Sequence, residues 1–178
     1  LVHTTWKGNV KGYNAIKNFN EWIDNKELLL EKLKNSGVGL HNNRTEYIWD
    51  FKDKFWANPK DFYFTTKKYH VKKRDSIVSK IKGISQAKIS FSLEQVHPNE
   101  CRVLCGDTHM LELYGMKTLK YKTGAGLRMY KKMERHWAIN CGKLGVPCYI
   151  ARCIYWDNKQ NKTDSRYWSY VYEDSLEQ

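Results

Sequence analysis

The sequence predicts a mainly α-helical protein that forms one compact domain over residues 1–178. Apolar residues recur at spacings of three and four through most of the chain, which is typical of helices that bury one face. Alternation of apolar and polar residues, the pattern of half-buried strands, is not sustained over several segments. The 178 residues are enough for one core, and neither an internal repeat nor a low-complexity linker divides them.

The composition favours a polyanionic partner. The chain has 31 lysine and arginine residues against 19 aspartate and glutamate residues, a formal net charge of +12. Such an excess suits nucleic acid, which basic proteins bind by neutralising phosphates. No apolar run approaches the ~20 residues that span a membrane, so no membrane partner is expected. The five cysteines, an odd number without the spacing of a disulfide framework, indicate a reducing compartment.

The first third of the chain predicts three helices and a helical turn. Apolar positions favour a helix over residues 8–23. Asn25 is placed to cap a second helix, over residues 26–35. A third helix is expected from about residue 42, and Asn58-Pro59 predicts a turn of helix that follows it.

The middle of the chain predicts two helices joined by a glycine turn. Residues 67–81 carry one apolar stripe, and the other faces are crowded with basic residues, namely Lys67, Lys68, Lys72, Lys73, Arg74 and Lys80. The turn is Lys82-Gly83-Ile84-Ser85, and the second helix begins at about Gln86. The backbone N–H groups of such a turn can bind a phosphate, helped by the dipole of the second helix.

The segment after this pair of helices ends on one acidic residue. Apolar Cys101–Cys105 leads to Asp107, which can cap a short helix that runs through Tyr114. A long helix then follows from about Leu127. The last segment, residues 148–158, predicts a helix, although its β-branched and aromatic residues make a strand the competing interpretation.

The hairpin and the Gly-Asp-Thr-His segment at residues 106–109 resemble the helix-hairpin-helix DNA glycosylases, the superfamily of endonuclease III. In that family a Val-Asp-Thr-His segment presents the catalytic aspartate, and the spacing of 24 residues from Gly83 to Asp107 is similar as well. Residues 37–44 resemble the turn that begins a helix in those enzymes. Thr4-Thr5-Trp6 falls where they carry a Ser-x-Gln segment near the displaced base. The similarity covers residues 1 to about 157 in order.

The resemblance implies a helix-hairpin-helix glycosylase-like bundle, which allows a two-lobed cleft, and a monomer that binds double-stranded DNA in the cytoplasm, at a nucleoid or in a nucleus. Two regions would bind the DNA backbone. One is Arg44. The other is the hairpin at 81–86 with nearby Lys88, and its contacts would be made by Lys82, Gly83, Ile84, Ser85, Gln86 and Lys88. Trp6 and His109 would line the base pocket or fill the gap that the base leaves.

The implied reaction is removal of a modified, damaged or mismatched base, as in base-excision DNA repair. Asp107 would stabilise positive charge on the sugar and activate water, after the nucleotide is rotated out of the stack. Purely structural roles for these residues stay open. Asp107 can be an N-cap alone, Trp6 can be a core residue, and His109 can simply pack beside the aspartate. Arg44 can pair with Glu46 or Asp50.

The sequence departs from the family at three points, and these change what is expected of the hairpin, of strand cleavage and of metal binding. Ser85 replaces the second glycine of the hairpin, where a positive φ would strain a serine. Ala87 stands where bifunctional members carry the lysine that attacks the sugar, so base release without strand cleavage is expected. The four-cysteine iron–sulfur loop is absent, since no fourth cysteine follows Cys141, Cys148 and Cys153. We therefore expect no cluster or other bound metal, apart from a monovalent cation that the hairpin carbonyls can hold in this family.

Other functions stay open at this point. An enzyme of the same fold can alter a flipped base instead of releasing it. A non-catalytic protein can retain only the hairpin contact with DNA. A nuclease can use Asp107 and Glu112 with a metal ion, although no Glu-x-Lys strand motif follows them.

Overall fold

All regular structure in the described part of the protein is helical. The computed structural model describes residues 6–64, 70–119 and 124–161, with side chains from residue 8 onwards. These ranges contain eight α-helices and two short 3-10 helices, and no strand. The mainly α class that the helical spacing predicts is therefore confirmed. Among the same residues, no helix combines the length and the apolar character that crossing a membrane requires.

The chain divides into two compact units. The first unit comprises Leu1–Tyr63 together with Ile81–Gly83. The second comprises Phe64–Lys80 together with Ile84–Gln178. The expectation of one domain with a two-lobed cleft stays a prediction.

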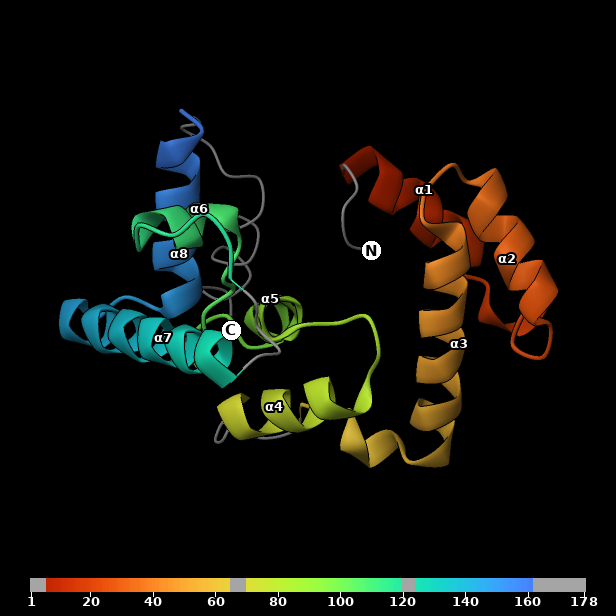
Figure 1. Ribbon diagram of the computed structural model, residues 1–178, viewed down its shortest axis with the longest axis horizontal. Helices are drawn as coiled ribbons and strands as arrows, with labels where there is room; N and C mark the ends of the chain where they lie inside the picture. The colour runs from red at the N-terminus through yellow and green to blue at the C-terminus, as the bar shows by residue number, and fades with distance from the viewer. Residues whose placement is uncertain (1–5, 65–69, 120–123, 162–178) are drawn as a thin grey trace, which may run out of the picture. The chain divides into compact units, whose positions relative to one another are not determined.

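In the described part of the first unit, three α-helices pack around a small apolar core (Figure 1). Leu29 and Leu33 have no exposed surface, and Trp22 and Val38 bury almost all of theirs beside them. Partly buried Trp49 packs against this cluster. The three helices are α1, Trp6–Ile16; α2, Lys26–Asn35; and α3, His41–Ala57.

The predictions for this unit are confirmed where a local capping signal exists. The Asn25 side chain accepts a hydrogen bond from the Leu28 N–H at 2.9 Å, and α2 has the predicted bounds. The single helix expected over residues 8–23 is wrong, because α1 ends at Ile16. The Trp22 indole turns into the core, and its N–H donates a hydrogen bond to the Ile16 carbonyl at 2.8 Å. This bond satisfies one of the carbonyl groups at the end of α1.

The connections on either side of α3 use less regular backbone. Gly37 and Gly39 both have φ of +69°, and Leu40 before the helix has φ of +47°. α3 therefore starts at His41, slightly earlier than the asparagines suggest. The turn after it is a 3-10 helix over Pro59–Asp61, as the proline predicts.

The described part of the second unit contains five α-helices. Of these, α7 and α8 cross each other rather than lie parallel (Figure 1). Leu104, Met110, Leu111 and Met133 form one of its apolar clusters. Residues 148–158 are helical, so the competing strand is wrong; the aromatic and β-branched residues serve a largely buried helix. The five helices are α4, His70–Lys80; α5, Gln86–Val96; α6, Thr108–Leu113; α7, Gly124–Leu144; and α8, Cys148–Lys159.

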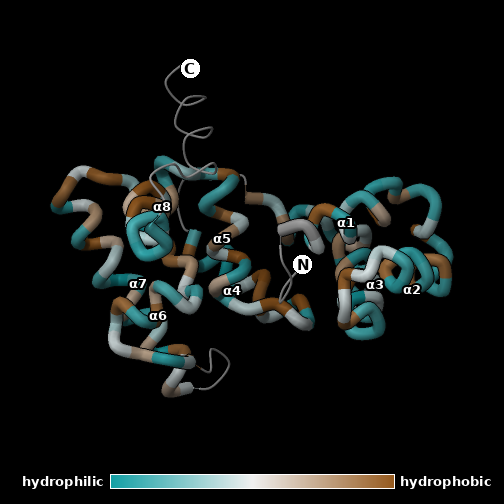
Figure 2. The backbone as a smooth tube through the Cα atoms, turned by 90° about the horizontal axis from the view of Figure 1, so that it is seen from above, coloured by the Kyte–Doolittle hydropathy of each residue, from teal (hydrophilic) through white to brown (hydrophobic). Residues whose placement is uncertain are grey.

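The hydrophilic and hydrophobic residues are interspersed along these helices, as helical amphipathicity requires (Figure 2).

One basic residue of α4, Arg74, does not lie on an exposed face of the helix. Arg74 has no exposed surface and donates hydrogen bonds to Glu134, to Asp75 at 2.8 Å and to Ser90 at 3.1 Å. Its place on a solvated basic face is therefore wrong, because it joins α4 to α5 and α7. Residues 67–69 of the predicted helix lie outside the described residues.

Candidate DNA-binding and catalytic site

The hairpin turn depends on a glycine at position 83. Gly83 has φ of +73°, in the left-handed region that other residues adopt at a cost. A Cβ atom there would lie 2.2 Å from the Tyr47 ring of α3, closer than any real contact. Ser85 has φ of −122° and ψ of 168°, so the strain that its replacement of a glycine predicts does not arise. The turn therefore needs only one glycine.

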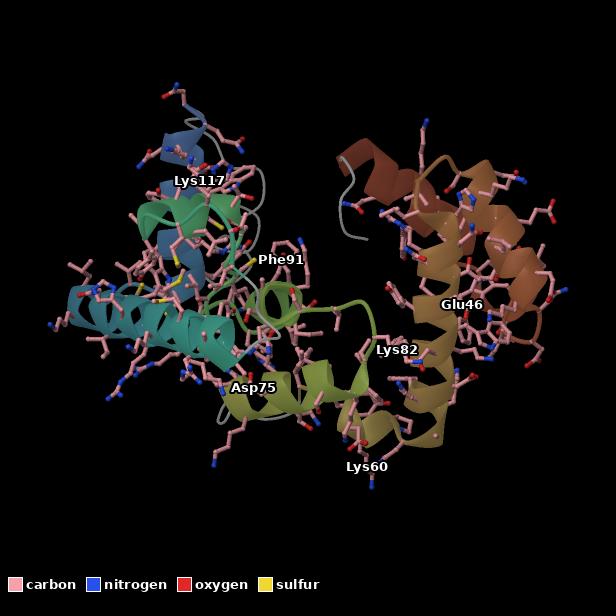
Figure 3. The ribbon with its side chains drawn as sticks, viewed as in Figure 1. Glu46, Lys60, Asp75, Lys82, Phe91 and Lys117 are labelled. Atoms are coloured by element: carbon pink, nitrogen blue, oxygen red, sulfur yellow. The ribbon has the colours of Figure 1, made fainter. Side chains whose placement is uncertain are left out.

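Two lysines of the predicted DNA-binding set point into solvent. The Lys82 side chain is 72% exposed, and its Nζ lies 3.8 Å from Asp50 Oδ1 (Figure 3). Asp50 is bonded more closely to Lys54, at 2.7 Å, and this bond holds the pKa of Asp50 below its usual value. Lys88 is exposed on α5. Both amines are therefore available to an anion.

The other predicted DNA contacts are less exposed. Ile84 and Ser85 are half-buried, Gln86 is only 6% exposed and Arg44 only 7%. Burial lowers the pKa of Arg44. Glu46 and Asp50 are the two ion-pair partners that the sequence suggests for Arg44. Both carboxylates pair with lysines, Glu46 with Lys26 at 2.7 Å and Asp50 with Lys54.

The position of the lyase lysine is also internal. Ala87 is 6% exposed, whereas the neighbouring Lys88 is exposed, so the two positions lie on different sides of α5. The Lys88 amine therefore does not substitute for a lysine at position 87.

Asp107 is held at the start of α6. Its Oδ1 accepts a hydrogen bond from the Met110 N–H at 3.0 Å, which makes it the N-cap that the sequence predicts. The segment before it anchors this end of the helix in the core through four buried residues, Cys101, Val103, Leu104 and Cys105. The Asp107 side chain remains 27% exposed. A carboxylate in this position is fixed at one oxygen and accessible to solvent.

The second oxygen of Asp107 faces a buried arginine. Arg152 Nη1 lies 3.6 Å from Asp107 Oδ2, which is an ion pair without hydrogen-bond distance. The same guanidinium donates to Glu94 Oε2 from Nε at 2.9 Å and from Nη2 at 2.7 Å. Glu94 Oε1 in turn accepts from the Cys105 N–H at 3.1 Å. A carboxylate–guanidinium–carboxylate chain therefore runs from the core to Asp107.

Burial and the neighbouring charges set the pKa values of Glu94 and Arg152. Burial raises the pKa of Glu94 to about 7, although the Arg152 charge and the Cys105 N–H act in the opposite direction. Burial alone would lower the pKa of Arg152, but the charge of Glu94 raises it, so the guanidinium stays protonated. Burial also raises the pKa of Cys105 to about 12 and of Cys153 to about 11, which keeps both thiols protonated and poorly nucleophilic.

Sequence reasoning missed Glu94 and Arg152. A signal for each exists, because a charged residue stands within an otherwise apolar pattern. Arg152 interrupts the apolar run from Cys148 to Trp156, and Glu94 lies seven residues after buried Ala87 on the same face of α5. Neither pattern states that the two side chains meet.

The two predicted pocket residues are placed differently. The His109 ring lies edge-on to Trp156 with centroids 5.8 Å apart, and its Nδ1 is 4.0 Å from Glu112. Trp6 is the first residue of α1, and its side chain lies outside the described part of the protein. Among the described residues, no group of three or more His, Cys, Asp or Glu side chains is arranged to hold a metal ion.

Comparison of the chain with protein-family models, with curated proteins and with solved structures finds no match. The function is therefore inferred from the residues of the chain itself. They supply a glycine turn with exposed lysines and, in the second unit, a partly exposed aspartate backed by a buried arginine–glutamate pair.

Proposed function

We propose that the protein binds double-stranded DNA through its hairpin and hydrolyses the N-glycosidic bond of a flipped base with Asp107. The observation that carries the proposal is the state of this carboxylate. One oxygen caps α6, and the other faces Arg152 without a hydrogen bond. An aspartate held in this way is oriented, and it keeps an oxygen for substrate or water.

The proposed reaction breaks the bond between the sugar C1′ and the base nitrogen. Positive charge develops on the sugar, and the Asp107 carboxylate stabilises it. A water oxygen then bonds to C1′ and its proton is passed to Asp107, while the leaving base takes up a proton from solvent or from the pocket. Position 87 provides no amine to form a Schiff base, so the strand stays intact and an abasic site remains.

The hairpin supports the DNA-binding part of the proposal. Its glycine turn precedes the N-terminus of α5, an arrangement that suits a phosphate. Exposed Lys82, within the turn, and exposed Lys88, on α5, add positive charge. Contacts of this kind position a duplex and do not choose the base.

A non-catalytic DNA-binding protein is the second candidate, and one observation favours it. The Asp107 carboxylate has a structural role as the N-cap of α6, which explains an aspartate there without chemistry. The two candidates differ in what removal of the Asp107 charge does to base release.

The test is a panel of duplex oligonucleotides, each with one damaged, mismatched or hypermodified base, followed by alkaline cleavage of abasic sites. Asp107→Asn should lower base release by about 100-fold or more, while DNA affinity is kept. Asparagine is as good an N-cap as aspartate, so the variant should stay folded.

Glu112→Gln is the matched control, because it removes the same charge from the same helix at an exposed position. It should leave base release within a few-fold of the wild-type protein. Base release that survives Asp107→Asn contradicts the proposed mechanism. Strand breaks without alkali, or a requirement for added magnesium, contradict a monofunctional hydrolase.

A further inference from the structure

α7 carries a row of cations on the side opposite its buried face. Tyr130 and Cys141 mark the buried side. Arg128, Lys132 and Arg135 are all exposed, and we call these three residues the basic row. At about 100° per residue they fall within roughly 60° of one another around the helix axis, on the far side from Tyr130.

No acidic side chain in the described part of α7 offsets the basic row. The helix has a single acidic residue, Glu134, which is 4% exposed and bonded to Arg74 and to the Leu104 N–H. The nearest carboxylate on the neighbouring helix α4, Asp75, is bonded to Arg74 and to Lys131 (Figure 3). Within the described ranges the basic row makes no ion pair, so its three charges face solvent.

We propose that the basic row binds the sugar–phosphate backbone of double-stranded DNA, as a contact additional to the hairpin. The inference rests on the DNA binding proposed above. Arg128 and Arg135 are about 10 Å apart along the helix axis, at 1.5 Å per residue. That length matches about three nucleotide steps of 3.4 Å on one strand. The row can therefore contact up to three phosphates.

Charge and side-chain type favour DNA over an acidic protein as the partner. Two of the three residues are arginines, whose forked guanidinium groups match the geometry of phosphate oxygens. The exposed apolar residues beside the basic row on α7 are Met129 and Ile139. They lie about 15 Å apart along the helix axis, at 1.5 Å per residue, so they do not form the joint apolar centre that a protein interface needs. A contact of this kind adds affinity and salt dependence without selecting a base.

The test is the salt dependence of DNA affinity for the whole chain. In the test variant, Arg128→Gln, Lys132→Gln and Arg135→Gln are combined; glutamine is a good helix former, and circular dichroism checks the fold. Fluorescence anisotropy with a labelled duplex gives the slope of log K against log salt. Removal of three phosphate contacts should reduce the steepness of this slope by up to about 2.7.

The matched control removes the same charge from the first unit. Lys11→Gln, Lys17→Gln and Lys34→Gln together change three exposed lysines that form no ion pair among the described residues. This variant should change the slope by less than about 1. The inference is overturned if both triple variants change the slope equally, since net charge alone would then explain the effect. An unchanged slope in the α7 variant, or a larger loss of affinity for duplex RNA than for duplex DNA, also overturns it.

Base release at saturating protein separates this inference from the proposed catalysis. The α7 variant should release base as the wild-type protein does once the DNA is fully bound. If the wild-type protein releases no base from any duplex but the α7 variant loses salt dependence, the glycosylase proposal fails and the DNA contact stands. If base is released and the slope is unchanged, the catalysis stands and the DNA contact fails.

Discussion

Two partly exposed aspartates of the second unit, each beside a buried arginine, differ in how their oxygens are used. Asp75 is 28% exposed and Asp107 is 27% exposed. Asp75 bonds to Arg74 through Oδ1 and to Lys131 through Oδ2, so both oxygens are occupied. Asp107 uses Oδ1 for the N-cap and leaves Oδ2 at 3.6 Å from Arg152. Equal exposure therefore does not mean equal access, because Asp107 keeps one oxygen without a hydrogen bond and Asp75 uses both.

The arginines behind these aspartates differ in the same way. Arg74 is surrounded by Glu134, Asp75 and Ser90, and Glu134 and Tyr130 raise its pKa although burial lowers it. Arg152 has one close carboxylate, Glu94, whose pKa burial raises to about 7. We call the Arg74 network closed, because its guanidinium hydrogen-bonds to three residues. In the Arg152 network, Glu94 can gain or lose a proton near neutral pH.

The largest expected effect comes from the closed network. Arg74→Met should lower the free energy of unfolding by about 3–5 kcal/mol, because it leaves the buried Glu134 side chain without its partner. Urea unfolding followed by circular dichroism measures this loss. Adding Glu134→Leu should recover at least half of it. A loss below about 1 kcal/mol would mean that the pair does not hold α4 against α7.

A smaller loss is expected at Arg152. Arg152→Met should cost about 2–3 kcal/mol near pH 8, less than Arg74→Met, since Arg152 hydrogen-bonds to Glu94 whereas Arg74 hydrogen-bonds to Glu134, Asp75 and Ser90. The cost should shrink near pH 5, where Glu94 takes up a proton. Base release at saturating DNA should also fall, because Asp107 loses the charge that faces Oδ2, while DNA affinity changes little. Equal losses of base release in Arg74→Met and Arg152→Met would remove the distinction between the two networks.

The smallest effect is the pH dependence contributed by Glu94. Its pKa is about 7 in the folded protein and 4.5 in the unfolded chain, so the folded state binds the proton more tightly. The resulting stabilisation is present in full below about pH 4.5 and is lost as the pH rises to about 7. Glu94→Gln should remove this component. Urea unfolding across that range, with Glu112→Gln as the reference, would show a flat difference if Glu94 does not titrate there.

Local signals predicted most of the fold, and long-range pairing was beyond them. The Asn25 cap set α2 and the Asp107 cap set α6, because an N-cap acts on residues within one turn. The first helix ends before Trp22, which packs against Leu29 and Leu33 of the next helix, and periodicity does not contain such contacts. Glu94 and Arg152 are 58 residues apart in the chain, so neither helix pattern could predict that they bond behind Asp107.

Ile81–Gly83 belongs to the first unit, and this has a consequence for fragment design. The chain leaves that unit after Tyr63 and returns for three residues before it leaves again. Gly83 lies against Tyr47, so a fragment that stops at Tyr63 would leave one side of that tyrosine ring uncovered. No single cut separates the two units cleanly. A fragment of the first unit would need the turn supplied in trans or joined by a circular permutation.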